Sequence, residues 1–343
     1  MSFWQKLPKP FFALAPMADV TDAAFRRVIA KHGKPDVMFT EFVSADGLVR
    51  ASETGKKKLL KDLEYSETER PVVAQLFSSH PQYMRKAAKL VRDLDFDGLD
   101  INMGCPDRGV EKQGAGAALI KNPKLAREVI RAAKEGFGGP VSVKTRIGYN
   151  IDELKTWLPE ILKEDVVAVT IHARTRKEMS KAPARWEAIS RAVKIRNEFL
   201  PDVLVIGNGD VKDLAHAREL AKETGADGVM LGRAIFGTPW LFSNSHELEN
   251  RSDPEVMKKI LYIMVEHTKL FDELLGGIKN FSIMKKHFKA YLSNFNGANE
   301  LRAKLMKTTS AKEVETAVYS LLDTLPKGIN LYEDVHFPFH TGR

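Results

Sequence analysis

Cysteine is almost absent from this sequence of 343 residues, which contains a single one, Cys105. One cysteine excludes an internal disulfide and any metal site built from several thiolates, which predicts a reducing compartment and no bound metal. Long apolar runs are also absent, since no stretch of 18 apolar residues occurs and the opening MSFWQKLPKPFF shows no secretory signal. We therefore expect a cytoplasmic monomer without a membrane partner.

Acidic residues are scarce in one segment near the C-terminus. The whole chain has 53 basic and 45 acidic side chains, hence a formal net charge of +8. Between residues 279 and 312, eight cations accompany the single anion Glu300, a net charge of +7 over 34 residues. The cations are Lys279, Lys285, Lys286, Lys289, Arg302, Lys304, Lys307 and Lys312. Such a segment is either a solvated helix face or a surface for a polyanion.

Aromatic side chains lie among these cations and favour the second interpretation. They are Phe281, His287, Phe288, Tyr291 and Phe295, and several of them must belong to the core. Bases stack on aromatic rings while phosphates pair with cations, so the combination is typical of a nucleic-acid surface.

Short β-branched runs alternate with amphipathic segments over the first two thirds of the chain. We expect strands at 11–17, 37–43, 72–77, 98–104, 141–148, 166–173, 203–209 and 228–234. Helical patterns such as 80–94, 122–136 and 211–225 lie between them, and the last two end on glycine after a basic turn. Eight strand-then-helix units predict a parallel (β/α)8 TIM barrel, with a doubly wound sheet as the alternative.

The strand pattern stops near residue 245. Four helical stretches follow, at 253–276, 281–295, 297–309 and 310–326, and the tail after them has no regular pattern. We therefore divide the chain into a barrel domain, 1–244, and a small all-helical domain with an irregular tail, 245–343.

Each expected strand delivers a polar or special residue at its carboxyl end, where barrel enzymes hold their active sites. The set comprises Pro16 with Met17, Glu41, Gln75, Asn102 with Cys105, Lys144 with Arg146, His172 with Arg174, Asn208 with Gly209 and Asp210, and Gly232 with Arg233. A barrel whose interior side chains serve packing alone does not require polar residues at the carboxyl end of every strand. We therefore expect the chemistry at this end.

The last two strands end in glycine-bearing loops, IGNGDV and MLGRA. Small residues there let backbone N–H groups approach an anion, and Arg233 can pair with a phosphate. A simple turn also explains the first loop. Lys144 is either a rim lysine or a fixed positive charge beside a ring. A histidine such as His172, seen alone, is more often a satisfied core residue, but Arg174 points to the same strand face and favours a polar cluster. Gln75 is either a hydrogen-bond partner for the edge of a heterocycle or a rim residue.

Cys105 admits two interpretations. A lone cysteine is commonly a small buried hydrophobe. Here it follows a strand end between Gly104 and Pro106 and precedes the glycine-rich GVEKQGAG, which favours a thiol directed into a pocket. No Cys-His-Asn order of a protease is present. A thiol with an ordinary pKa of about 8.5 stays protonated at neutral pH and can act as a general acid.

These motifs resemble the flavin-dependent tRNA-dihydrouridine synthases along nearly the whole chain. The matching stretches are APMADVTDAAFR (15–26), DINMGCP (100–106) with GAGAAL (114–119), VKTRIG (143–148), IHARTR (171–176), IGNGDV (206–211), GVMLGRA (228–234) and the C-terminal KKHFKAYLSNFNGANELRAKL. The resemblance implies FMN across the barrel mouth, NAD(P)H as reductant, and reduction of the uridine C5=C6 bond in tRNA, with Cys105 protonating C5.

The resemblance also implies roles for individual residues. Cofactor contacts are expected from Pro16, Met17, Ala18, Gln75, Lys144, His172, Asn208, Gly209, Asp210, Gly232 and Arg233. Substrate contacts are expected from Asn102 and Arg174, and tRNA contacts from Lys285, Lys286, Lys289 and Arg302 in the helical domain.

The sequence departs from the family pattern in two loops. Gly109, beside Arg108, stands where a basic residue is frequent, and Glu178, Ser180, Ala182 and Arg185 precede Trp186 where Gln, Tyr, Gly and Asp are common. These departures concern the substrate-facing loop and hence the tRNA position. Two rival functions remain, an FMN barrel that reduces a small molecule, similar to dihydroorotate dehydrogenases or enoate reductases, and a non-catalytic tRNA-binding protein.

Overall fold

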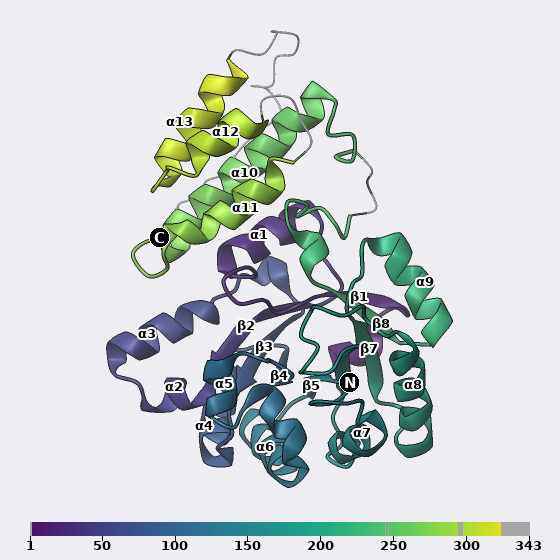
Figure 1. The fold of residues 1–343 in the computed structure, drawn as a ribbon. Helices are drawn as coiled ribbons and strands as arrows, with labels where there is room; N and C mark the ends of the chain where they lie inside the picture. The colour runs from purple at the N-terminus through teal and green to yellow at the C-terminus, as the bar shows by residue number, and fades with distance from the viewer. Residues whose placement is uncertain (1, 244, 246, 294–297, 324–343) are drawn as a thin grey trace.

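The structure is a computed structural model, and it describes residues 2–243, 245, 247–293 and 298–323. Eight parallel strands form its centre, in the order β1-β8-β7-β6-β5-β4-β3-β2 (Figure 1). The strands are β1 (Phe11–Leu14), β2 (Met38–Ser44), β3 (Val72–Phe77), β4 (Gly98–Met103), β5 (Val141–Arg146), β6 (Ala168–His172), β7 (Leu204–Asn208) and β8 (Gly228–Leu231). All eight expected strands are therefore present.

The two end strands of this order also meet. Ala13 and Val37 form an isolated parallel bridge, and the backbone N–H of Leu14 donates to Val37 O at 3.1 Å. This contact brings β1 beside β2 and closes the ring of strands. The predicted (β/α)8 barrel is confirmed, and the doubly wound sheet is excluded.

Helices surround the barrel on its outside (Figure 1). They are α1 (Ala23–His32), α2 (Ala45–Arg50), α3 (Glu53–Asp62), α4 (Pro81–Asp93), α5 (Arg108–Lys112), α6 (Pro123–Phe137), α7 (Leu154–Leu162), α8 (Glu187–Phe199) and α9 (Leu214–Thr224). The short 3-10 helices are η1 (Phe3–Lys6), η2 (Glu67–Glu69), η3 (Gly116–Lys121), η4 (Arg233–Ile235) and η5 (Phe281–Ile283).

The ends of α6 illustrate why the sequence places helices where it does. The Asn122 side chain accepts the Leu125 N–H at 3.2 Å, and Pro123 begins the helix without a donor to satisfy. Gly138 ends the helix at φ 68°, in the left-handed region that favours glycine. The helix therefore lies within one or two residues of the expected range.

The barrel interior changes from apolar to polar along the strands. At the amino ends, Trp4 of η1 packs with Phe11 and Phe39, and this buried cluster continues along the strands to Ile206 and Met230. Side chains alternate between the two faces of a strand, so the inward positions nearer the carboxyl ends belong to polar residues. These include Gln75, Asp100, Asn102, Lys144, His172 and Asn208. The polar inner layer thus lies at the barrel mouth.

The C-terminal segment is helical, as expected. It contains α10 (Pro254–Leu275), α11 (Met284–Tyr291), α12 (Ala298–Leu305) and α13 (Ala311–Leu322), and α10 packs on α1 of the barrel (Figure 1). Buried side chains of α10 and α1 belong to the same hydrophobic cluster. The domain boundary at 244 stays a prediction, and the expected irregular tail lies outside the described residues. Within the described ranges, no helix is both long and apolar enough to span a membrane.

Candidate active site

The carboxyl ends of the strands surround a cavity of about 260 Å³. Ten of the predicted site residues lie in its wall, namely Pro16, Met17, Lys144, His172, Arg174, Asn208, Gly209, Asp210, Gly232 and Arg233. The wall also contains Ala15, Arg146, Ser180, Val211 and Met230, for which no individual cofactor or substrate contact was predicted. The predicted residues Ala18, Gln75, Asn102 and Cys105 do not line it.

Asp210 lies between two arginines at one side of the cavity. Its Oδ1 accepts Arg233 Nη2 at 2.6 Å, and its Oδ2 accepts the Arg174 guanidinium and the Ala184 N–H. Burial opposes the charge on this carboxyl, but these hydrogen bonds outweigh burial and lower its pKa. Asp210 therefore stays ionised and orients Arg233, whose side chain is 64% exposed and available to an anion.

His172 faces the cavity as a neutral imidazole. Its Nε2 lies 3.1 Å from Arg174 Nη1, and a guanidinium can only donate, so Nε2 accepts and the ring proton resides on Nδ1. Burial, together with the positive charges of Arg146 and Lys144, lowers the pKa of His172 well below its usual value. This side chain can donate a hydrogen bond from Nδ1 but carries no charge at neutral pH.

Lys144 provides a cation at the centre of the wall. Its Nζ donates to Asn208 Oδ1 at 3.3 Å, while Asn208 Nδ2 donates to Met230 O at 2.8 Å. Burial and the nearby Arg146 lower the pKa of Lys144 to about 8, although Asp100 opposes this change. The ammonium is therefore only weakly held in its charged form, and an anionic group in the cavity stabilises it.

Gln75 and Asn102 belong to a buried hydrogen-bond network beside the cavity. Gln75 Nε2 donates to Asp100 Oδ2 at 2.7 Å, and Asn102 Nδ2 donates to Gln75 Oε1 at 2.9 Å. Ser142 Oγ donates to the other Asp100 oxygen at 2.6 Å. Asn102 Oδ1 then accepts the Cys105 backbone N–H at 2.8 Å. In this structure the network links the barrel interior to the Cys105 loop.

Cys105 is half-buried directly after β4. It packs beside Phe77, Val110 and Ala115, and its carbonyl accepts the Ala117 N–H at 3.0 Å. Burial raises the pKa of the Cys105 thiol above its ordinary value, against the opposing effects of the Asp107 N–H and nearby cations. The group is therefore a protonated thiol at neutral pH, as the predicted acid role requires.

Arg146 is a site residue to which the sequence analysis gave no role. Its Nε donates to Gly104 O at 2.7 Å, and its Nη1 donates to Thr175 O at 3.1 Å and to Met179 O at 3.0 Å. It thus lines the cavity and joins the Cys105 loop to the loop after β6. The sequence feature that could have identified Arg146 as a site residue is its position two residues after Lys144, on the same face of the strand.

The loop after β6 contains the departures from the family pattern. Glu178 accepts the Thr175 N–H at 2.7 Å and pairs with Arg185, so these two departures form a local ion pair. Ser180 lines the cavity. Arg176 Nε donates to both Glu111 carboxylate oxygens, at 2.8 and 2.9 Å, which ties this loop to α5 after Cys105.

The predicted tRNA surface differs from the expectation in part. Lys286 and Lys289 on α11 are exposed, while Lys285 and Arg302 are half-buried. Arg302 donates to Asn299 Oδ1, and no ion pair involving any of these four cations occurs among the described residues. Lys279 is different, because its side chain is 12% exposed and is paired with carboxylates of the barrel.

The aromatic residues of this segment do not form a stacking surface. His287, Phe288 and Tyr291 are fully buried, and Phe281 packs against the core. The sequence pattern of α11 places them on its inner face, opposite the exposed lysines. Phe295 lies outside the described residues. The expectation that several of these rings belong to the core is confirmed for the three buried side chains.

A closed parallel barrel with a cationic cavity at the carboxyl ends of its strands defines a (β/α)8-barrel enzyme with an anion-accepting site. The sequence model for dihydrouridine synthase (Dus) matches residues 13–326, and the chain therefore belongs to the dihydrouridine synthase family. The resemblance found in the sequence motifs is confirmed.

Similar proteins cover nearly the whole chain. A Bacillus subtilis (strain 168) protein named "Probable tRNA-dihydrouridine synthase 2" is 43% identical over 315 residues, which are 91% of this chain and 94% of that protein. A Staphylococcus epidermidis (strain ATCC 12228) protein named "Probable tRNA-dihydrouridine synthase" is 40% identical over 336 residues, 97% of this chain and 99% of that one. Histamine dehydrogenase from Rhizobium sp. 4-9 shares the fold, with a TM-score of 0.50 and 14% identity over 76% of this chain and 48% of its own.

Proposed function

We propose that this protein is a flavin-dependent tRNA-dihydrouridine synthase, which reduces the C5=C6 bond of specific uridines in tRNA with FMN and NAD(P)H. One observation carries the cofactor assignment. The cavity wall contains the four cations Lys144, Arg146, Arg174 and Arg233 against the single carboxylate Asp210, a net charge of +3 with His172 neutral. Such an excess suits a phosphorylated anion, and FMN carries its phosphate as a dianion.

The phosphate end of the cofactor fits the loops after β7 and β8. Gly209 has φ 127°, and an added Cβ there would lie 2.9 Å from Ala184 Cβ and 3.1 Å from His172 Cδ2. The loop therefore needs glycine, whose bare backbone lets an anion approach. Arg233 supplies the bidentate partner. The carboxylate of Asp210 repels a phosphate. We therefore assign Asp210 the role of orienting Arg233, and not a direct contact with the phosphate.

The ring end fits the apolar part of the wall. Ala15, Met17 and Met230 give it apolar surface, and Lys144 provides the cation that an anionic ring stabilises. When bound there, FMN reduced by NAD(P)H supplies the hydride that is added to uridine C6. Gln75 and Asn102 belong to the adjoining hydrogen-bond network, where Asn102 orients the Cys105 loop.

Cys105 completes the reduction as the proton donor. Hydride addition at C6 leaves an electron pair at C5, and the Cys105 S–H transfers its proton there, which leaves a thiolate that takes a proton back from solvent. A thiol of raised pKa is suited to this role, because it is fully protonated before the step. His172 Nδ1–H and the substrate-facing Arg174 bound the space in which the base is received.

The uridine must leave its stack in the tRNA to reach the cavity, at a cost of a few kcal/mol. Lys285, Lys286, Lys289 and Arg302 provide phosphate contacts that offset this cost. A reductase that acts on a small molecule, the rival function, does not require a basic surface on its C-terminal helices.

Two measurements test the proposal. Dihydrouridine mapping in tRNA from cells with and without the gene should show the loss of at least one modified position. Purified protein with FMN and NADPH should add dihydrouridine to unmodified tRNA. If neither result is obtained, the function is wrong, and turnover of a free small substrate by protein lacking residues 245–343 supports the rival reductase.

A further inference from the structure

The ammonium of Lys279 is enclosed where the barrel meets the C-terminal helices. Its Nζ lies 2.6 Å from Glu41 Oε2, 2.8 Å from Asp62 Oδ1 and 3.8 Å from Asp19 Oδ1. The side chain of Lys279 is 12% exposed and that of Glu41 5%. One residue of the turn after α10 therefore meets the middle of β2, the end of α3 and the loop between β1 and α1.

Glu41 contacts both Lys279 and the β1–α1 loop. Its Oε1 accepts the Asp19 backbone N–H at 2.6 Å. Asp19 has φ 52°, a conformation that a residue other than glycine rarely adopts unless its surroundings hold it. Within the same loop, the Met17 N–H donates to Thr21 Oγ1 at 2.9 Å, and the Thr21 N–H donates to Met17 O at 3.0 Å. Met17 in turn lines the cavity.

Carboxylates outnumber cations in this cluster. Burial, together with the negative charges of Asp62 and Asp22, raises the pKa of Glu41 to about 7, and Lys279 opposes this change. Asp22 is fully buried, and its Oδ2 has no hydrogen-bond partner within the described ranges. A buried carboxylate without a counter-charge is strongly destabilising, so the geometry of the cluster depends on the ammonium.

We propose that Lys279 is a positioning residue for the cavity, since through Glu41 and Asp19 it holds the β1–α1 loop in the conformation that lines the cofactor site. The inference rests on the proposed function, because that function places FMN against Met17 of this loop. It also means that docking of the C-terminal helices and cofactor binding are coupled through one ion cluster, although the tRNA contacts and the cofactor lie on different parts of the chain.

The test compares Lys279→Met with Lys31→Met in the full-length protein. Lys31 on α1 also forms an ion pair with the C-terminal helices, at 2.6 Å from Glu266 of α10. Amide hydrogen exchange is measured over residues 15–22 in the cofactor-free protein, and the FMN dissociation constant is measured from flavin fluorescence. Lys279→Met should accelerate exchange in this loop and weaken FMN binding roughly tenfold or more, the effect of losing one charge-assisted hydrogen bond. Lys31→Met should match the wild type in both.

The outcomes separate the two proposals. Wild-type exchange and wild-type FMN affinity in Lys279→Met overturn the positioning role. If the wild type itself fails to bind FMN, the proposed function is wrong, while loop exchange still decides the role of Lys279. Should Lys279→Met not fold, the double variant Glu41→Gln/Lys279→Met removes the charge of Glu41, the most deeply enclosed partner of Lys279, and keeps an acceptor for the Asp19 N–H. Fast exchange in the loop of this variant supports the role, and wild-type exchange overturns it.

Discussion

At the scale of single residues, the thiol of Cys105 combines partial burial with a fixed loop. Asn102 Oδ1 accepts the backbone N–H groups of Gly104 and Cys105, and Arg146 Nε donates to Gly104 O. Three contacts on two neighbouring residues leave the backbone of the loop little freedom. The thiol is therefore held in place by groups that line or underlie the cavity, which is how a proton donor is kept at a constant position.

Replacement of Cys105 by alanine should therefore remove the acid and leave the cofactor site intact. We expect Cys105→Ala to bind FMN as the wild type does and to lose about 10²–10⁴-fold of its turnover on tRNA, the usual contribution of a general acid. Because burial raises the pKa of the thiol, the decline in rate that its deprotonation causes should begin only above the ordinary thiol pKa of about 8.5. Single-turnover kinetics measure both effects, and unchanged turnover in the variant removes the acid role.

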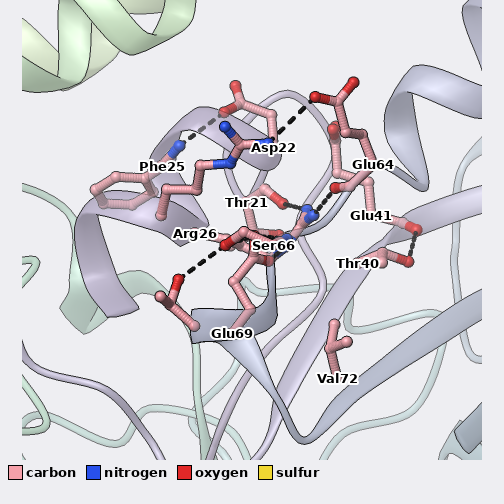
Figure 2. Close-up of polar contacts among 12 residues, drawn as sticks. Thr21, Asp22, Phe25, Arg26, Thr40, Glu41, Glu64, Ser66, Glu69 and Val72 are labelled. Atoms are coloured by element: carbon pink, nitrogen blue, oxygen red, sulfur yellow. Dashed lines mark hydrogen bonds and ion pairs between the residues drawn. The ribbon is translucent and has the colours of Figure 1, made fainter. Parts of the chain in front are cut away.

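Arg26 and Glu69 form an ion pair with both side chains 0% exposed, under the loop that leads into α1. Arg26 Nε donates to Glu69 Oε2 at 2.7 Å, and its Nη1 donates to Thr21 O at 2.8 Å (Figure 2). Glu69→Met leaves a buried guanidinium without its counter-charge and should lower the free energy of unfolding by about 3–5 kcal/mol. Urea denaturation of this variant and of Arg26→Met/Glu69→Met tests it. The double variant should be the more stable of the two, and a loss below about 1 kcal/mol in the single variant contradicts the prediction.

At the scale of elements, α10 and α11 place two histidines against α1 of the barrel. The rings of His267 and His287 lie 4.6 Å apart, and Phe25 stacks on His267 at 4.7 Å. Both histidines are fully buried, and burial lowers the pKa of His287 to about 3 and that of His267 well below its usual value. The facing polar groups are Tyr291, whose hydroxyl lies 3.3 Å from His267 Nδ1, and the nearby charge of Lys286.

This packing predicts a loss of stability in mild acid. The unfolded chain binds protons at these histidines below a pH of about 6.5, whereas the folded chain does not, so stability is present above this pH and falls as the pH is lowered. Each histidine contributes a loss of about 1.4 kcal/mol between pH 7.5 and 5.5. Urea denaturation at both pH values measures it. Between the two pH values, the free energy of unfolding of His287→Phe should fall by about 1.4 kcal/mol less than that of the wild type. An equal fall in both proteins contradicts the assignment.

The same elements show how much the sequence could predict. Each expected strand is present, because short β-branched runs bounded by turn residues favour buried strands. The order of the strands then brings Lys144, His172 and Asn208 together. The positions of Lys279 and Glu41 could not be predicted, because they are 238 residues apart and meet only through tertiary packing. For the same reason Lys279 was counted with the basic surface, and the sequence did not show which of the aromatic residues, His287 among them, belong to the core.

At the scale of the whole molecule, the basic residues of the C-terminal helices and the cavity lie in two parts that share one hydrophobic core. A rigid connection between them is useful to an enzyme on tRNA, because phosphate contacts made far from the cavity can then help to place one uridine. Lys279 lies at this connection. The surface cations and the cavity should therefore contribute separately, the first to tRNA affinity and the second to the reaction.

Charge reversal on α11 tests this separation. Lys285→Glu/Lys286→Glu/Lys289→Glu should weaken tRNA binding and reduce the slope of log affinity against log salt by about 2–3, since each lost phosphate contact reduces it by roughly 0.7–0.9. FMN binding should be unchanged.

The matched control reverses three exposed lysines on outer barrel helices, Lys86 of α4, Lys194 of α8 and Lys222 of α9, and so changes the net charge equally. Filter binding at several salt concentrations measures both variants. If the control reduces the slope as much as the α11 variant, net charge alone attracts the tRNA and α11 is a solvated face. If only the α11 variant does, its lysines contact the phosphates directly.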